Sequence, residues 1–140
     1  MTFSVAGESA DAIVLHFFAS WCEPCREELP ALRRLSDRGA PRLKVVAIAV
    51  ADNDAPLRRV IEATGVTFPV LMDRDRAVAR AWSISALPST VILDSRHAPR
   101  LIVETDVAWD GLEPKLLLDR LSMPAKDVQA PLTIDKPGGQ

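Results

Sequence analysis

Two apolar runs of strand length, separated by a helical segment, constrain the fold of this chain more than any other feature. Residues Ala12–Ala19 (AIVLHFFA) and Leu43–Val50 (LKVVAIAV) are almost continuously apolar. Such continuous runs are typical of strands that are buried on both faces of a sheet. Between them, Glu23–Asp37 carries leucines at helical spacing. A strand, a helix and a strand in this order predict two parallel neighbours in a sheet that is covered by helices.

The remaining segments extend this sheet. We expect a helix over Asp54–Thr64, an edge strand over Thr67–Met72, a short helix over Arg74–Trp82, a hairpin of Thr90–Asp94 with Arg100–Thr105, and a last helix over Gly111–Leu121. Asp54 and Asp110 are the expected N-caps, and Gly65 is expected to end its helix. The sequence therefore predicts an α/β fold, in which a central mixed sheet combines a parallel part with a C-terminal antiparallel hairpin and carries helices on both faces.

Composition agrees with a single domain. The chain has 140 residues and a net charge of −2, and it has no basic stripe of the kind that nucleic-acid binding requires. No apolar run approaches the roughly 18 residues of a membrane span. We expect a folded domain over residues 1–123 and a Pro/Gly-rich tail over 124–140 that adds little to the core. Met1–Ser4 carries no signal-peptide pattern, which predicts a cytosolic protein or a trimmed mature chain.

The chemistry of the chain is concentrated in Trp21-Cys22-Glu23-Pro24-Cys25, which holds both cysteines. The motif follows a strand and opens a helix, so free N–H groups and the helix dipole favour a thiolate at Cys22. Cys22 is therefore the expected nucleophile and Cys25, one turn further, the resolving cysteine. Pro24 stiffens the turn, and the negative charge of Glu23 moderates the stabilisation of the thiolate.

Two other interpretations of the cysteine pair stay open. A zinc site would need two more ligands, and the only histidines, His16 and His97, lack finger-like spacing. A purely structural disulfide over four residues would contribute only about 2 kcal/mol, against about 3 kcal/mol for a fifteen-residue loop. Redox activity is the interpretation that best fits a CxxC after a strand. We expect His97 to be solvated and Trp82 to pack in the core. Trp109 is expected to pack in the core, with a surface position near a binding face as the alternative.

A wider set of motifs resembles a known family. The segments FFASWCEPCREELPAL, FPVLMD and ALPSTVILD follow one another as they do in thioredoxin-like proteins. The chain most resembles the TlpA/ResA type of thiol:disulfide oxidoreductases, over residues 12–121. The most specific features are WCxPC, a proline five residues after the second cysteine (Pro30, expected to kink the helix), and a later Pro-x-Thr before a strand. The resemblance implies a thioredoxin-like fold.

The resemblance also implies a role for each matching residue. Cys22 would attack a substrate disulfide, and Cys25 would resolve the mixed disulfide. Pro88 would be a cis proline packed against the disulfide, and Leu87 would offer its backbone to a bound substrate strand. Trp21 would cover the rim of the site, with ordinary core packing as the alternative.

Two positions depart from the family's pattern. His16 stands six residues before Cys22, where relatives carry aspartate or asparagine. It either relays a proton to or from Cys25 or is a neutral core histidine satisfied by a hydrogen bond. The resemblance also implies an acidic residue after the second strand, for which Asp52 is the best match and Asp54 the next. The alternative for Asp52 is a solvated loop carboxylate or a helix cap.

The function implied by the resemblance is an enzyme that reduces specific protein disulfides, for example in cytochrome c or copper-site maturation. Its redox group would be the Cys22–Cys25 disulfide, with no other cofactor and no metal. We expect a protein disulfide substrate and a thiol-disulfide electron donor as partners, no nucleic acid, and a monomer with a membrane tether further upstream. The implied location is the periplasm or another extracytoplasmic space of a bacterium, with the cytoplasm as the alternative.

Three alternative functions stay open at this point. The chain could act as a disulfide oxidase or isomerase. It could be a Sco-like copper-binding module, although such proteins carry CxxxC where this chain has CxxC. A peroxiredoxin-like peroxidase would need threonine three residues before the reactive cysteine, where this chain has Ala19.

Overall fold

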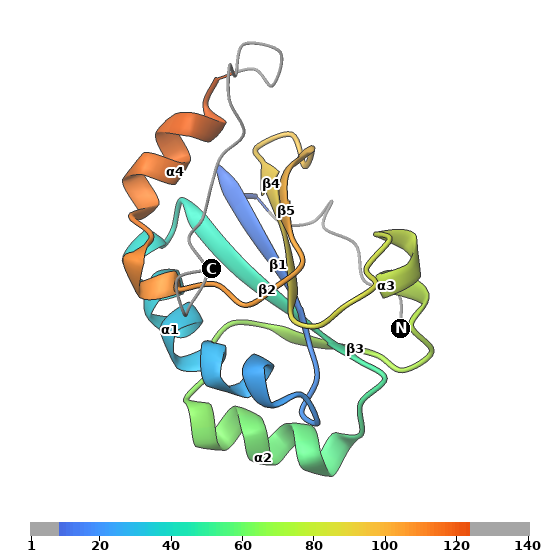
Figure 1. The fold of residues 1–140 in the computed structure, drawn as a ribbon. Helices are drawn as coiled ribbons and strands as arrows, with labels where there is room; N and C mark the ends of the chain where they lie inside the picture. The colour runs from blue at the N-terminus through green and yellow to red at the C-terminus, as the bar shows by residue number, and fades with distance from the viewer. Residues whose placement is uncertain (1–8, 124–140) are drawn as a thin grey trace.

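The computed structural model describes residues 9–123, which form one mixed five-stranded sheet with helices packed against it (Figure 1). The strand order is β3-β2-β1-β4-β5. The strands are β1 (Ala12–Phe18), β2 (Leu43–Val50), β3 (Val70–Asp73), β4 (Ser89–Asp94) and β5 (Pro99–Val103). The first three are parallel to one another, and β4 and β5 run antiparallel to their neighbours. The predicted α/β fold class is confirmed; the predicted tail over 124–140 lies outside the described residues.

The helices cover both faces of this sheet. They are α1 (Glu23–Gly39), α2 (Asp54–Thr64), α3 (Ala77–Ala81), the 3-10 turn η2 (Trp109–Gly111) and α4 (Pro114–Leu121). One buried cluster joins the sheet to α1, α2 and α4, through side chains such as Leu29, Leu57 and Leu117. A second cluster, on the other face, joins it to α3 through Ala79. In Figure 1, α1 and α4 accordingly lie on the side of the sheet away from α3. None of the described helices is long and apolar enough to cross a membrane.

Strand β1 occupies the centre of the sheet and is fully buried. Its side chains alternate between the two faces, as the pleat of a strand requires. Val14 and Phe18 belong to the α1 cluster, whereas Leu15 and Phe17 belong to the α3 cluster. His16 shares the face of Val14 and Phe18, so it lies beneath α1.

The predicted helix over Arg74–Trp82 is shorter in the structure. Arg76 adopts a left-handed backbone with φ 64°, so regular helix begins only at Ala77. The Asp73 carboxylate accepts hydrogen bonds from the N–H groups of Val78 and Ala79, at 3.0 and 2.8 Å. These are two of the N–H groups that a helix leaves unpaired at its start. A side chain from the end of β3 therefore sets where α3 begins.

The predicted final helix over Gly111–Leu121 is divided in two. Pro114 disfavours helical backbone at the residue before it, and Glu113 is extended with ψ 117°. Helix α4 therefore begins at Pro114. The prediction that Asp110 is an N-cap is wrong, because its carboxylate bonds to Arg34 at 2.7 and 2.9 Å.

The other boundaries differ by a few residues. Asp54 is the first residue of α2 rather than its N-cap, which is Asn53. The predicted edge strand is confirmed as β3, although it begins at Val70, after Pro69. Helix α1 continues through Pro30 to Gly39. Gly65 ends α2 with a left-handed φ of 72°, as expected of a helix-terminating glycine.

Candidate active site

A disulfide joins Cys22 and Cys25 at the amino end of α1, with their Cα atoms 5.3 Å apart. Cys22 is the N-cap residue of the helix and has an extended backbone. Its side chain does not cap the helix, so the N–H groups of the first turn remain available to an anion at this position. Cys22 is 8% exposed and Cys25 is fully buried. The more accessible cysteine is therefore the one that the sequence assigns as nucleophile.

The residues around the cysteines lie on the surface. Trp21 is 57% exposed, and its indole N–H donates to the carbonyl of Ala51 at 3.2 Å. The core-packing alternative for Trp21 is thus wrong, and its ring is held to the residue that follows β2. Glu23 and Pro24 are exposed first-turn residues of α1.

The Leu87–Pro88 peptide bond is cis, as the resemblance implied. Pro88 is buried, and Leu87 is half-buried and packs against both hydrophobic clusters. Both residues stand directly before β4, which pairs with β1. A second cis bond, Ala40–Pro41, follows α1 and was not predicted.

Asp52 is a buried residue that holds the loop before the cysteines. It is 4% exposed and accepts hydrogen bonds from the N–H and the hydroxyl of Ser20, both at 2.6 Å. A third bond, 2.8 Å long, comes from the N–H of Asn53. Asp52 is therefore not a solvated loop carboxylate, and it ties the end of β2 to a residue two positions before Cys22. Asp54 is exposed and pairs with Arg74 at 2.6 Å.

His16 is fully buried, and its nearest hydrogen-bond partner among the described residues is a neutral threonine. Its Nδ1 lies 3.0 Å from Oγ1 of Thr90 in a hydrogen bond across β1 and β4. Its Nε2 has no hydrogen-bond partner among residues 9–123. Burial lowers the pKa of His16 from 6.5 to about 3, so the ring is neutral at physiological pH.

Glu28 is the ionisable residue that sequence reasoning missed. It lies on α1, three residues after Cys25, and is only 5% exposed. Residues three apart on a helix are surface neighbours, so its side chain lies on the same face as Cys25. Its Oε1 accepts a hydrogen bond of 2.5 Å from the Trp109 indole and lies 4.0 Å from Nδ1 of His16. Its Oε2 has no hydrogen-bond partner in the described part of the chain.

Burial is the main cause of an unusual pKa at Glu28, which is raised from 4.5 to about 8. The negative charge of Asp106 raises it further, while hydrogen bonds from Trp109 and from the backbone of Val107 lower it. Glu28 therefore carries its proton at neutral pH while His16, next to it, carries none. The two groups form a buried, neutral acid–base pair beneath the helix that bears the disulfide.

Aromatic side chains enclose this pair. Trp109 is fully buried, as expected, with its ring edge-on to His16 at a centroid distance of 6.3 Å. Phe18 stacks against His16 at 6.1 Å. Away from this site, Trp82 is half-buried against the α3 cluster, and His97 is also half-buried rather than fully solvated.

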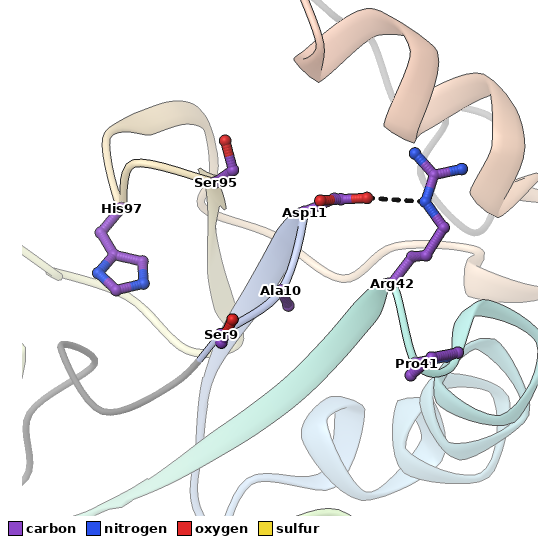
Figure 2. Close-up of a pocket in the computed structure, with 7 residues that line it drawn as sticks. All are labelled: Ser9, Ala10, Asp11, Pro41, Arg42, Ser95 and His97. Atoms are coloured by element: carbon purple, nitrogen blue, oxygen red, sulfur yellow. Dashed lines mark hydrogen bonds and ion pairs between the residues drawn. The ribbon is translucent and has the colours of Figure 1, made fainter.

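Hollows open at opposite ends of the sheet. One, of about 530 Å³, lies at the amino ends of β1 and β2, where Asp11 pairs with Arg42 (Figure 2). Because the cysteines follow the carboxyl end of β1, this hollow is at the opposite end of the sheet. The second, of about 480 Å³, lies between α1 and α2 and includes Ser20 in its lining. Within residues 9–123, no group of three or more His, Cys, Asp or Glu side chains is arranged to hold a metal ion.

Comparison with known proteins agrees with these features. The family model described as AhpC/TSA family matches residues 2–98. The thioredoxin-like protein YneN of Bacillus subtilis is 31% identical over 110 residues, covering 76% of this chain and 64% of that protein. The thiol-disulfide oxidoreductase ResA of B. subtilis is 31% identical over 86 residues, covering 59% of this chain and 46% of ResA. The chain thus spans less than two thirds of the length of these relatives.

Solved structures agree on the fold. A thioredoxin-family thiol:disulfide interchange protein from Chlorobium tepidum superimposes with a TM-score of 0.72 at 24% identity, over 83% of this chain and 86% of that one. A secreted disulfide oxidoreductase from Mycobacterium tuberculosis gives 0.68 at 21% identity, over 86% and 87%. With the disulfide at the start of α1 and the cis proline before β4, these comparisons show that the chain has a thioredoxin-like fold and belongs to the AhpC/TSA family.

Proposed function

We propose that this protein is a thiol:disulfide oxidoreductase that reduces disulfides in other proteins. The observation that carries the proposal is the Cys22–Cys25 disulfide at the amino end of α1. Cys22 is the more exposed of the two cysteines. The names of the relatives ResA and YneN support it.

The reaction is a double exchange of disulfide bonds. The Cys22 thiolate attacks one sulfur of the substrate disulfide, so a mixed disulfide forms while the other substrate sulfur leaves as a thiolate and takes up a proton. The Cys25 thiolate then attacks Cys22, which releases the second substrate thiolate and closes the Cys22–Cys25 disulfide. The substrate gains two electrons and two protons, and a dithiol donor later restores the reduced protein.

Glu28 supplies the proton chemistry that the second step needs. Cys25 is buried, so the proton of its thiol must pass to a nearby acceptor before it can attack. A carboxyl with a pKa of about 8 is roughly one-tenth ionised at pH 7, and can therefore both accept and return a proton near neutral pH. His16 lies 4.0 Å from Glu28, and because burial lowers its pKa to about 3 it is a much weaker base than Glu28 and does not compete for this proton at neutral pH. Leu87 and Trp21 border the site from the substrate side.

The direction of electron flow and the location of the protein belong to the same proposal. The CxPC motif favours a reductant, which acts on specific disulfides such as those of cytochrome c or copper-site maturation. The similarity to a secreted disulfide oxidoreductase supports an extracytoplasmic location. A measured reduction potential well above about −180 mV, on the oxidase or isomerase side, would contradict the reducing role.

Trapping tests the proposal directly. Cys25→Ser removes the resolving thiol, so Cys22 should remain linked to its substrate and shift on a non-reducing gel. The matched control, Cys22→Ser, leaves only the buried cysteine and should capture far less. Equal capture by both variants, or no reduction of a disulfide peptide by the wild type, would overturn the proposal. Thiol-coupled peroxide consumption by the wild type would instead favour the peroxidase alternative.

A further inference from the structure

The hollow between α1 and α2 begins beside the disulfide. Its lining comes from the loop before the cysteines, from the first turns of α1, and from one face of α2: Ser20, Arg26, Pro56, Arg59, Val60, Ala63 and Thr64. Ser20 lies two residues before Cys22, and Arg26 directly follows Cys25. Lining residues from both sides of the cysteine pair in the chain therefore place the hollow near the disulfide.

The charges that line this hollow are positive. Arg26 donates to the backbone carbonyl of Ser20 at 2.8 Å, and Arg59 forms no hydrogen bond or ion pair with any residue in the range 9–123. None of the described residues that line the hollow carries a carboxylate. Several other arginines pair with aspartates, such as Arg33 with Asp37, Arg34 with Asp110 and Arg74 with Asp54.

The nearby acidic residues do not neutralise these arginines. Asp52 is buried and already accepts three hydrogen bonds from Ser20 and Asn53. Asp54 is paired with Arg74. Glu62 follows Arg59 by three residues on α2 but is not part of the lining. The side chains that line the hollow thus include two arginines and, among residues 9–123, no acidic residue, although Glu23 lies three residues before Arg26 on α1.

The rest of the lining is apolar or small. Pro56, Val60 and Ala63 form one stripe of α2, because residues spaced by three and four share a helix face. From Pro56 to Ala63 the helix rises about 10 Å, which is the length of about three extended residues. The hollow thus matches a short extended segment that carries both an apolar and an acidic side chain.

We propose that this hollow binds an acidic, partly apolar segment of the protein substrate, a few residues from the cysteine that Cys22 attacks. This inference rests on the proposed function and names the substrate class. A carboxylate of the substrate pairs with Arg59 and Arg26, and an apolar neighbour packs on the α2 stripe. The substrate is then selected by the residues that flank its disulfide, as well as by the disulfide itself.

The test compares two disulfide peptides that differ only in the flanking residues. One carries glutamates two to four residues from its cysteine, and the other carries glutamines at those positions. With the full-length reduced protein, we expect the acidic peptide to be reduced about two- to fivefold faster, the range that one exposed ion pair allows. The preference should shrink in 0.5 M salt, because screening weakens exposed charge pairs.

Variants of α2 separate this site from a general charge effect. Arg59→Gln should clearly reduce the preference for the acidic peptide, because only Arg26 remains, and Arg59→Glu should remove or reverse it. The matched control is Arg58→Gln, which removes the same charge from an exposed neighbour that does not line the hollow. An equal effect of Arg58→Gln and Arg59→Gln would overturn the inference, as would equal reduction of both peptides by the wild type.

A binding measurement keeps the inference separate from the proposed function. An acidic peptide with serine in place of cysteine cannot exchange disulfides, but it should still bind the oxidised protein, more weakly after Arg59→Gln than after Arg58→Gln. If both reactive peptides fail to be reduced while this binding persists, the proposed function is wrong and the docking site stands. If both are reduced equally and the serine peptide does not bind, the docking site is wrong and the function stands.

Discussion

The buried pair of His16 and Glu28 predicts that the stability of the oxidised protein has a flat maximum in mildly acidic solution. Burial lowers the pKa of His16 from 6.5 to about 3 and raises that of Glu28 from 4.5 to about 8. Stability rises with pH wherever the unfolded chain binds more protons than the folded protein, and falls where it binds fewer. The cysteines do not titrate in the disulfide form, so they do not contribute.

The two groups act in opposite directions. The contribution of His16 is complete above pH 6.5 and is lost as the pH falls towards about 3. The contribution of Glu28 is complete below pH 4.5 and is lost as the pH rises through about 8. Between pH 4.5 and 6.5 the two slopes cancel. On either side, one proton changes the unfolding free energy by about 1.4 kcal/mol per pH unit, which amounts to about 2 kcal/mol between pH 6.5 and 8.

The assay is urea unfolding of the oxidised protein at half-unit steps from pH 3.5 to 8.5, on the wild type and two variants. Glu28→Gln keeps the shape of the side chain without a titrating group, so the decline above pH 6.5 should disappear. His16→Asn should remove the rise at acid pH, and the decline should then begin near pH 4.5. Below pH 4.5, the wild-type curve must be compared with that of His16→Asn. The lowered pKa values of Asp94 and Asp110 also make stability rise with pH there, so a single curve does not isolate His16.

The decisive comparison is between the wild type and Glu28→Gln above pH 6.5. If the curves of Glu28→Gln and the wild type run parallel from pH 6.5 to 8.5, the pKa of Glu28 is not raised in the folded protein, and the argument that it exchanges protons with Cys25 near neutral pH fails with it. If the wild-type curve is flat while the variant's declines, the sign of the reasoning is wrong.

Three further substitutions test the surroundings of the site. Asp52→Asn should lower the unfolding free energy by about 1–3 kcal/mol, as measured by denaturant titration, because the charged acceptor of three hydrogen bonds is lost. Trp109→Phe removes the hydrogen bond that lowers the pKa of Glu28, so the alkaline decline in stability should extend to higher pH. Gly65→Ala should cost about 1–2 kcal/mol in the same titration, because φ is +72° although the nearest atom, Nε of Arg33, leaves room at 3.9 Å. No loss of stability in Gly65→Ala would show that α2 ends without strain in another backbone conformation.

Much of the sheet could be predicted because its strands are continuous apolar runs. Strand β2 has the predicted limits, and β1 ends one residue earlier than predicted. The boundaries that depend on a distant side chain could not be predicted in the same way. The start of α3 is set by hydrogen bonds to Asp73. Asp110 does not cap a helix because its carboxylate binds Arg34, which lies on α1. Secondary-structure propensity and hydrophobic periodicity depend only on residues that are close in sequence, so they do not predict these long-range contacts.

The candidate site shows the same division. The cysteines and Pro88 stand in recognisable motifs, whereas Glu28 is a charged residue in a helix whose apolar positions define its face. The sequence does contain a signal that Glu28 is buried. It occupies the same helix face as the apolar positions, since the spacing is three or four between Cys25, Glu28, Leu32 and Leu35. The chemical role of Glu28 depends on its contacts with His16 of β1 and Trp109 of η2, which form only in the folded protein.

The placement of Cys22, Cys25 and Glu28 on successive turns of α1 restricts how this sequence can evolve. Each residue added to or removed from the helix between the cysteines and the glutamate turns the glutamate by about 100° around the axis. A single insertion there would leave the motif readable in the sequence but would move the carboxyl off the face that holds Cys25. Lineages that change the spacing between the second cysteine and the glutamate must therefore recruit a different proton acceptor or lose this one, and the offset of three residues between Cys25 and Glu28 is as much a signature as the CxxC itself.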